Sequence, residues 1–241
     1  MSNRISQATS DKVNAQRQAL KTPRAAAVAG IVFAVLFTTA ISLMRLAVSD
    51  QLSAATTLAD VQQNSAMLSL ALTLLPFAGI SFLWFVGVVR DHLGEYEDKF
   101  FSSIFFGSGL LFLAMIFVTG AVVGAVIMVY PLTVNTLGQS DVILFGRALV
   151  YSLLNVYVVR MAGVFMFSVG TIWVRTRVMP RAFVLLTYLL ALVLLFGLGV
   201  SSWLLLVFPV WVFGVSVYIL FKSWRGEQQQ ANELLGAAPD A

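Results

Sequence analysis

Apolar residues run almost without interruption through five stretches that are each long enough to cross a bilayer. A spanning helix needs about 20 mostly apolar residues, because it rises about 1.5 Å per residue across about 30 Å of hydrocarbon. The runs lack the alternation of polar and apolar positions that marks the strands of an outer-membrane barrel, so we expect helices. The five stretches are 25–48, 66–89, 103–130, 182–200 and 203–221.

A sixth span lies within residues 142–174, a stretch longer than the hydrocarbon layer requires. Either the span is 153–174, with residues 142–152 lying in the interface or projecting from it, or the whole stretch crosses at a steep tilt. In both cases the sequence predicts an all-α polytopic membrane protein, a bundle of six transmembrane helices. This transmembrane domain, residues 25–221, lies between polar tails at 1–24 and 222–241.

Lys and Arg residues are distributed unevenly between the two sides of the predicted bundle. Twelve of the 15 lie in the two tails and in the second and fourth loops, whereas the loops on the opposite side contain none. Because cytoplasmic loops of membrane proteins carry the excess of positive charge, we expect both termini in the cytoplasm. We expect the membrane to be the plasma membrane of a bacterium.

The composition supports this class and removes several kinds of chemistry. The chain is 59% hydrophobic and 11% charged, whereas a soluble domain is about 45–50% apolar and about 25% charged. It has no cysteine and one histidine, His92, which excludes disulfides, thiolate metal sites and cysteine nucleophiles and disfavours a histidine-built metal or haem site. The net charge of +4 fits anionic lipid headgroups, and we expect no nucleic-acid partner.

The acidic residues point away from catalysis and from proton coupling. All eleven Asp and Glu residues fall in the predicted tails or loops, whereas proton-coupled transporters and pumps usually need a carboxylate or histidine inside the membrane. The sequence lacks HExxH spacing, and its outer-side serines lie across the membrane from His92. We therefore expect no catalytic residues, no cofactor and no metal site.

One polar stripe falls inside the apolar part of the chain. Arg147, Tyr151 and Asn155 recur every four residues and share a helix face, and Arg160 follows them. If the span begins near residue 153, Arg160 reaches toward the outer headgroups; if the whole stretch crosses, it falls near the midplane. An ionisable residue at that depth is a functional candidate, so the stripe could line a wet vestibule for an anion.

Arg45 lies close to the outer end of the first predicted span. Its side chain can extend to the headgroups, and Asp50 and Asp60 in the next loop could pair with it. We interpret it as an interfacial anchor.

The second loop is an acidic island on the otherwise basic side. Its polar residues could bind a hard cation, but we favour a solvated turn that presents a surface to a partner. The residues concerned are Arg90, Asp91, His92, Glu95, Glu97 and Asp98.

The segment from Leu83 to Phe101, LWFVGVVRDHLGEYEDKFF, resembles a segment of uncharacterised bacterial multi-pass membrane proteins. That resemblance implies no activity. Within it, Gly87 to Gly94 resembles a loop of major-facilitator transporters, but His92, Glu95 and Tyr96 stand where that family has basic residues. Such transporters also have about twice as many spans, so we expect no membership of that family.

Small residues spaced by four occur on two predicted spans. They are Ala26, Gly30 and Ala34 on the first, and Gly120 and Gly124 on the third. Such faces let helix backbones approach closely in lipid. We favour packing within the chain over a face that binds a second copy or another membrane protein.

The sequence therefore indicates a non-enzymatic integral membrane protein of structural, accessory or scaffolding type. The alternative is a small passive channel or a transporter of anions or amphiphiles built around Arg160. An enzyme acting on lipid headgroups is a more distant third, because neither face gathers a recognisable acid–base set.

Overall fold

The computed structural model describes residues 2–47, 64–93, 99–129, 139–177, 179–197 and 202–236, and this part of the chain contains helices and no strand. The predicted all-α class is confirmed. In chain order the elements are α1 (Ser2–Ala47), α3 (Ser65–Leu93), α4 (Lys99–Val129), α5 (Gln139–Ser152), the π-helical turn η2 (Leu153–Val158), α6 (Val159–Thr176), α7 (Arg181–Phe196), the short 3-10 helix η3 (Ser202–Leu206) and α8 (Val207–Gly236).

In the part of the chain that the structure describes, five helical segments are long and apolar enough to cross a membrane, as expected for a multi-pass protein. They are Arg24–Ala47, Ser65–Arg90, Phe100–Met128, Leu144–Thr176 and Trp203–Arg225. The predicted span 182–200 corresponds to α7, which ends at Phe196 after 16 residues. At about 1.5 Å per residue this is about 24 Å, less than the usual thickness of the hydrocarbon, so the sixth span is not confirmed.

The long stretch at 142–174 is one helix that includes a single irregular turn. It runs through α5, η2 and α6 from Gln139 to Thr176. The expected projecting segment and the expected span are therefore consecutive parts of one continuous helix, joined by the π turn η2. Both predicted tails also continue as helix, since α1 begins at Ser2 and α8 extends to Gly236.

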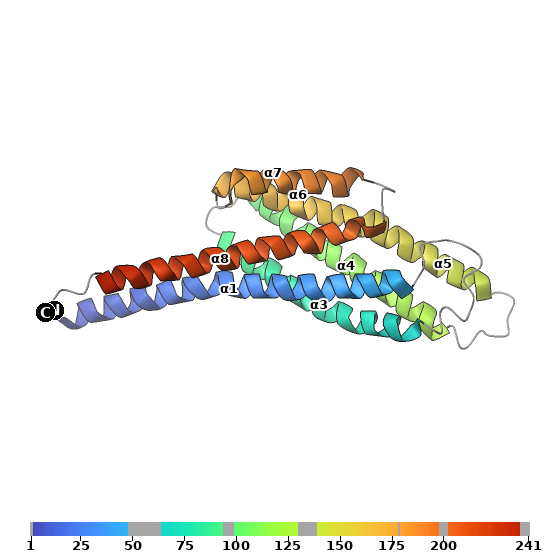
Figure 1. Cartoon of the computed structure of the whole chain (residues 1–241), viewed down its shortest axis with the longest axis horizontal. Helices are drawn as coiled ribbons and strands as arrows, with labels where there is room; N and C mark the ends of the chain where they lie inside the picture. Colours follow the sequence, from blue (N-terminus) through green and yellow to red (C-terminus); the bar gives the residue numbers. More distant parts are fainter. Residues whose placement is uncertain are drawn as a thin grey trace.

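The helices run along one long axis and pack mainly against their neighbours (Figure 1). α1 contacts α3 and α8, α4 contacts α3 and α6, and α7 packs on α6 at the edge of the bundle. At one end, where α1 begins and α8 finishes, these two helices extend beyond the others (Figure 1). There the Arg24 Nε atom donates a hydrogen bond to the Ser223 hydroxyl oxygen at 3.2 Å.

The reversal from α6 to α7 is built by a left-handed residue followed by a proline. Arg177 has a φ of 52°, and its backbone N–H donates to the Trp173 carbonyl, which closes the last turn of α6. Pro180 is extended, and its carbonyl accepts the N–H groups of Phe183 and Val184 at the start of α7. These bonds satisfy backbone groups that helix ends otherwise leave open.

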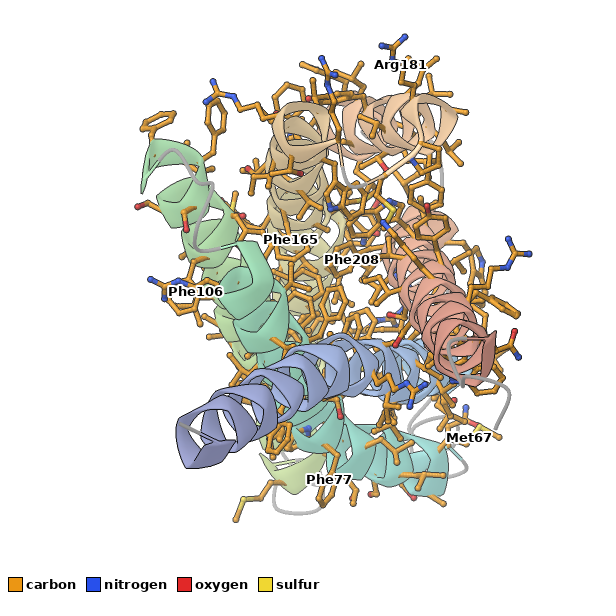
Figure 2. All side chains as sticks on the ribbon, turned by 90° about the vertical axis from the view of Figure 1, so that its left-hand side faces the viewer. Met67, Phe77, Phe106, Phe165, Arg181 and Phe208 are labelled. Carbon is orange, nitrogen blue, oxygen red and sulfur yellow. The ribbon has the colours of Figure 1, made fainter. Side chains whose placement is uncertain are left out.

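Phenylalanine side chains from α1, α3, α4, α6 and α8 meet in the centre of the bundle. The Phe208 ring lies 4.7 Å from Phe112, 5.7 Å from Phe165 and 5.8 Å from Phe82, measured between ring centroids. Phe33 packs 4.8 Å from Phe82 on the side of α1, and all five rings are fully buried. Figure 2, viewed along the bundle, shows Phe165 and Phe208 pointing into this centre. The core is therefore an aromatic cluster that ties five helices together.

Candidate functional site

A polar contact between α1 and η2 joins two parts of the chain that are distant in sequence. The Nη2 atom of Arg45 donates a hydrogen bond to the side-chain carbonyl oxygen of Asn155 at 2.9 Å. The Arg45 side chain is half-buried, and its Nε atom is enclosed by protein. Hydrogen bonds to a charged donor are stronger than neutral ones. Arg45, which the sequence placed at the lipid interface, is therefore part of a contact between helices.

Asn155 also stabilises its own helix. Its amide nitrogen donates to the Tyr151 carbonyl at 2.9 Å, so that both ends of the amide group are used. In a π turn, backbone bonds shift from the fourth to the fifth residue along the chain. At the edge of this wider turn, the Asn155 side-chain amide donates to the Tyr151 carbonyl, the acceptor that a backbone N–H four residues along would use in an α-helix.

Arg160 points to its own helix rather than into the aromatic centre. Its Nη1 atom donates to the Val156 carbonyl at 3.2 Å, and the side chain is half-buried. Arg160 lies five residues beyond Asn155, which is about 8 Å along the helix. Asn155 contacts Arg45, which lies two residues before α1 ends at Ala47. Arg160 therefore lies about 8 Å deeper in the bundle than this contact, measured from the end where α1 finishes.

The rest of the predicted polar stripe extends along α5. Arg147 is half-buried, whereas Tyr151 is exposed and contributes its backbone carbonyl to Asn155. Of the predicted stripe, Tyr151 and Asn155 are therefore joined to each other, and Arg45 bonds to Asn155 from another helix. The predicted partners of Arg45, Asp50 and Asp60, lie outside the described residues.

The basic end of the bundle places arginine side chains on aromatic rings. The Arg90 guanidinium lies 4.8 Å from the centre of the Phe106 ring, and that of Arg175 lies 4.7 Å from the centre of Phe101. Both rings belong to the first turns of α4, and the arginines come from the ends of α3 and α6. These cation–π contacts hold three helix ends together.

The structure describes the start of the predicted partner loop, including Arg90 at the end of α3. Glu95, Glu97 and Asp98 lie outside the described residues, and Asp91 and His92 are described only as the last part of the α3 backbone. Within the described residues, no group of three or more His, Cys, Asp or Glu side chains could hold a metal ion.

The small-residue faces are occupied by helices of the same chain. A Cβ atom added to Gly30 would overlap the Ser216 hydroxyl of α8 and approach a Phe85 ring carbon of α3 to 2.8 Å. One added to Gly120 would come within 2.8 Å of Leu75 on α3. Ala26 and Ala34 are buried beside Gly30, and Gly124 faces Leu72. In this structure both faces serve close packing within the bundle.

Sequence reasoning missed the pairing of Arg45 with Asn155, two residues separated by 110 positions in the chain. A signal for it was present, because polar groups near the membrane interior tend to pair with one another. The π turn gave no such signal, since its composition is that of an ordinary apolar helix.

No protein-family model, curated protein or solved structure matches the chain. Function is therefore inferred from the chain's own residues.

Proposed function

We propose that this chain is a multi-pass membrane protein of structural or accessory type, which organises the bilayer or other membrane proteins and catalyses no reaction. The aromatic cluster around Phe208 carries this proposal. A conducting protein needs a continuous polar path, whereas here five fully buried rings meet in the centre of the bundle. Closely packed rings favour a rigid closed bundle.

The polar side chains inside the bundle support the same conclusion. Ser168 and Thr119 each donate to a carbonyl of their own helix four residues earlier, at 2.8 Å and 2.7 Å. The Trp211 indole N–H donates to the Thr187 hydroxyl oxygen at 2.9 Å. The first two bonds satisfy buried hydroxyls within their own helices, and the third joins α8 to α7, as expected of polar groups that stabilise packing in lipid.

Six crossings, with both termini in the cytoplasm of a bacterium, are part of the proposal. The apolar part of α1 begins beside the place where the apolar part of α8 ends, since Arg24 bonds to Ser223, and this proximity supports an even number of passes. α7 completes that number. Although α7 is short, its outward side chains are apolar, as with Leu185, Leu189 and Phe196, and bilayers thin locally around short helices.

The crossing of α7 can be tested by single-cysteine labelling, because the natural chain contains no cysteine. With a membrane-impermeant maleimide on intact spheroplasts, Phe196→Cys should label at once, as should Leu46→Cys at the end of α1. Arg181→Cys and Trp224→Cys should label only after permeabilisation. If Phe196→Cys behaves like Trp224→Cys, the six-span topology is wrong.

A flux assay separates the accessory role from transport. Proteoliposomes containing the wild-type protein should release chloride, phosphate and a small fluorescent amphiphile no faster than protein-free liposomes. Arg160→Ala should leave this baseline unchanged, and Arg90→Ala serves as the matched control at the other end of the bundle. A wild-type flux that is lost in Arg160→Ala and kept in Arg90→Ala would establish transport instead.

A further inference from the structure

The junction between α5 and α6 differs from every other part of the described long helices, because its backbone forms a π turn at Leu153–Val158. A π turn carries one more residue per hydrogen-bonded ring than an α-helix and is rare as a regular structure. It is a place where the axes of two helical segments can change their angle without breaking the chain.

Side-chain hydrogen bonds flank this turn on both sides. Asn155 donates to the Tyr151 carbonyl at 2.9 Å, and Arg160 donates to the Val156 carbonyl at 3.2 Å. Each bond spans four residues, the spacing of the α-helical backbone bond. Both bonds lie within the helix that contains the turn, and neither of them joins the turn to another helix.

Arg45 provides the contact to Asn155 from another helix. Its 2.9 Å hydrogen bond joins the last turn of α1 to the middle of the π turn. A neutral amide oxygen accepting from a guanidinium gives a strong bond in a medium of low dielectric constant. This bond therefore fixes the position of the turn relative to α1.

Beyond the turn, α5 is held on one side. It contacts α4, where Gly146 allows close approach: a Cβ atom there would come within 2.5 Å of Val126. Leu144 and Phe145 on α5 are exposed. α5 is therefore an arm with one packed face, attached to the bundle through the π turn.

We propose that η2 is a hinge and that the Arg45–Asn155 hydrogen bond is the latch that fixes the angle between α5 and α6. This device goes beyond the accessory role and does not depend on it. With the latch broken, α5 can rotate about η2 while the aromatic core stays packed. The arm from Asn155 to Phe145 is about 15 Å long, so a swing of about 20° moves its tip by about 5 Å.

The hinge can be measured by electron–electron double resonance between spin labels at Met128→Cys on α4 and Phe145→Cys on α5. Both positions are exposed, and the chain has no cysteine that would need removal. In nanodiscs, the protein with an otherwise natural sequence should give one narrow distance distribution. Arg45→Met and Asn155→Leu should each add a second population, displaced by about 5 Å.

Two further substitutions make the test specific. Asn155→Asp keeps an acceptor for Arg45 and should retain the single narrow distance distribution. Arg160→Gln should retain it too, because among the described contacts the Arg160 guanidinium bonds only within its own helix. Labels at Val174→Cys on α6 and Leu185→Cys on α7 report whether the bundle has kept its fold. If Arg45→Met changes the distance between the labels at residues 174 and 185, the distance measured in Asn155→Leu between residues 128 and 145 is used to judge the latch.

The latch is refuted if the distribution stays narrow in Asn155→Leu, or if Arg160→Gln broadens it as much as the latch variants do. Flux measurements do not enter this test, so the hinge and the accessory role can fail separately.

Discussion

Trp211 of α8 donates its indole N–H to the hydroxyl oxygen of Thr187 on α7 at 2.9 Å, and Thr187 in turn donates to the Phe183 carbonyl at 2.9 Å. Trp211 and Thr187 are both buried. A second bond, 3.0 Å between the hydroxyls of Thr171 and Tyr188, joins α7 to α6. α7 is therefore fixed to its neighbours by hydrogen bonds as well as by apolar packing.

The Trp211–Thr187 bond should contribute measurably to stability. In a double-mutant cycle of Trp211→Phe and Thr187→Val, we expect a coupling free energy of about 0.6 kcal/mol, the average for side-chain hydrogen bonds between membrane helices. Reversible unfolding in mixed micelles or steric trapping measures it. Additive effects of the two substitutions would show that the bond contributes nothing.

The close approach of α1 and α8 at Gly30 should make this position intolerant of a methyl group. Gly30→Ala should lower the free energy of unfolding by about 1–3 kcal/mol, because the added Cβ atom overlaps Ser216 and crowds Phe85. Gly87, where a Cβ atom meets nothing within 4 Å, is the matched control. Equal effects of Gly30→Ala and Gly87→Ala would contradict the close contact.

Ser216 offers the opposite prediction. Its buried hydroxyl oxygen has no hydrogen-bond partner among the residues that the structure describes, and an unsatisfied polar group costs free energy in the folded state. Ser216→Ala should therefore be neutral or stabilising by about 1 kcal/mol. Ser168→Ala is the control, because the Ser168 hydroxyl bonds to the Val164 carbonyl. Marked destabilisation by Ser216→Ala in the same unfolding assay would contradict this account.

Arg177 caps α6 in a conformation that glycine adopts more easily. Its φ of 52° is left-handed, which costs residues with a Cβ atom about 1 kcal/mol. Arg177→Gly should be more stable than Arg177→Ala by about this amount, although both variants lose the same charge. Unfolding measured on the two variants together isolates the backbone effect, and a more stable Arg177→Ala would contradict it.

The stabilising effect of the Arg175–Phe101 cation–π contact should be measurable by comparing substitutions of two neighbouring rings. Phe100 and Phe101 form an edge-to-face pair at 5.4 Å, and Arg175 lies over Phe101. Phe100→Leu and Phe101→Leu both lose the ring pair, but only the second loses the cation–π contact with Arg175. Phe101→Leu should cost about 0.5–1 kcal/mol more, and an equal loss of unfolding free energy would show that the contact is not stabilising.

The sequence predicted the helices better than their contacts. Continuous apolar runs decide where a helix can cross a bilayer, so segments such as Arg24–Ala47 and Ser65–Arg90 were predicted closely, although α1 and α8 continue as helix into the predicted tails. The second-last predicted span was too long because the apolar pattern continues past Phe196, where α7 ends. Hydropathy averages the residues of a stretch and therefore does not show at which residue a helix ends.

The candidate site was predicted in part. A repeat of four brought Arg147, Tyr151 and Asn155 onto one face, but it could not show that Asn155 lies beside Arg45. That contact depends on how α1 packs against a helix 110 residues away in sequence. Likewise, the aromatic centre was visible only as a high phenylalanine content, since neighbouring helices must be placed before ring contacts can be assigned.

We infer that the middle of the bundle is closed and excludes water, and thiol labelling of the core can measure whether it does. Phe208→Cys and Met166→Cys place single thiols at fully buried positions, and Trp224→Cys places one at an exposed position. With a small, charged thiol reagent applied from both sides of proteoliposomes, we predict no labelling at residues 208 and 166 in the time that labels residue 224 completely. Labelling of Phe208→Cys as fast as Trp224→Cys would reveal a water-filled path and contradict the account.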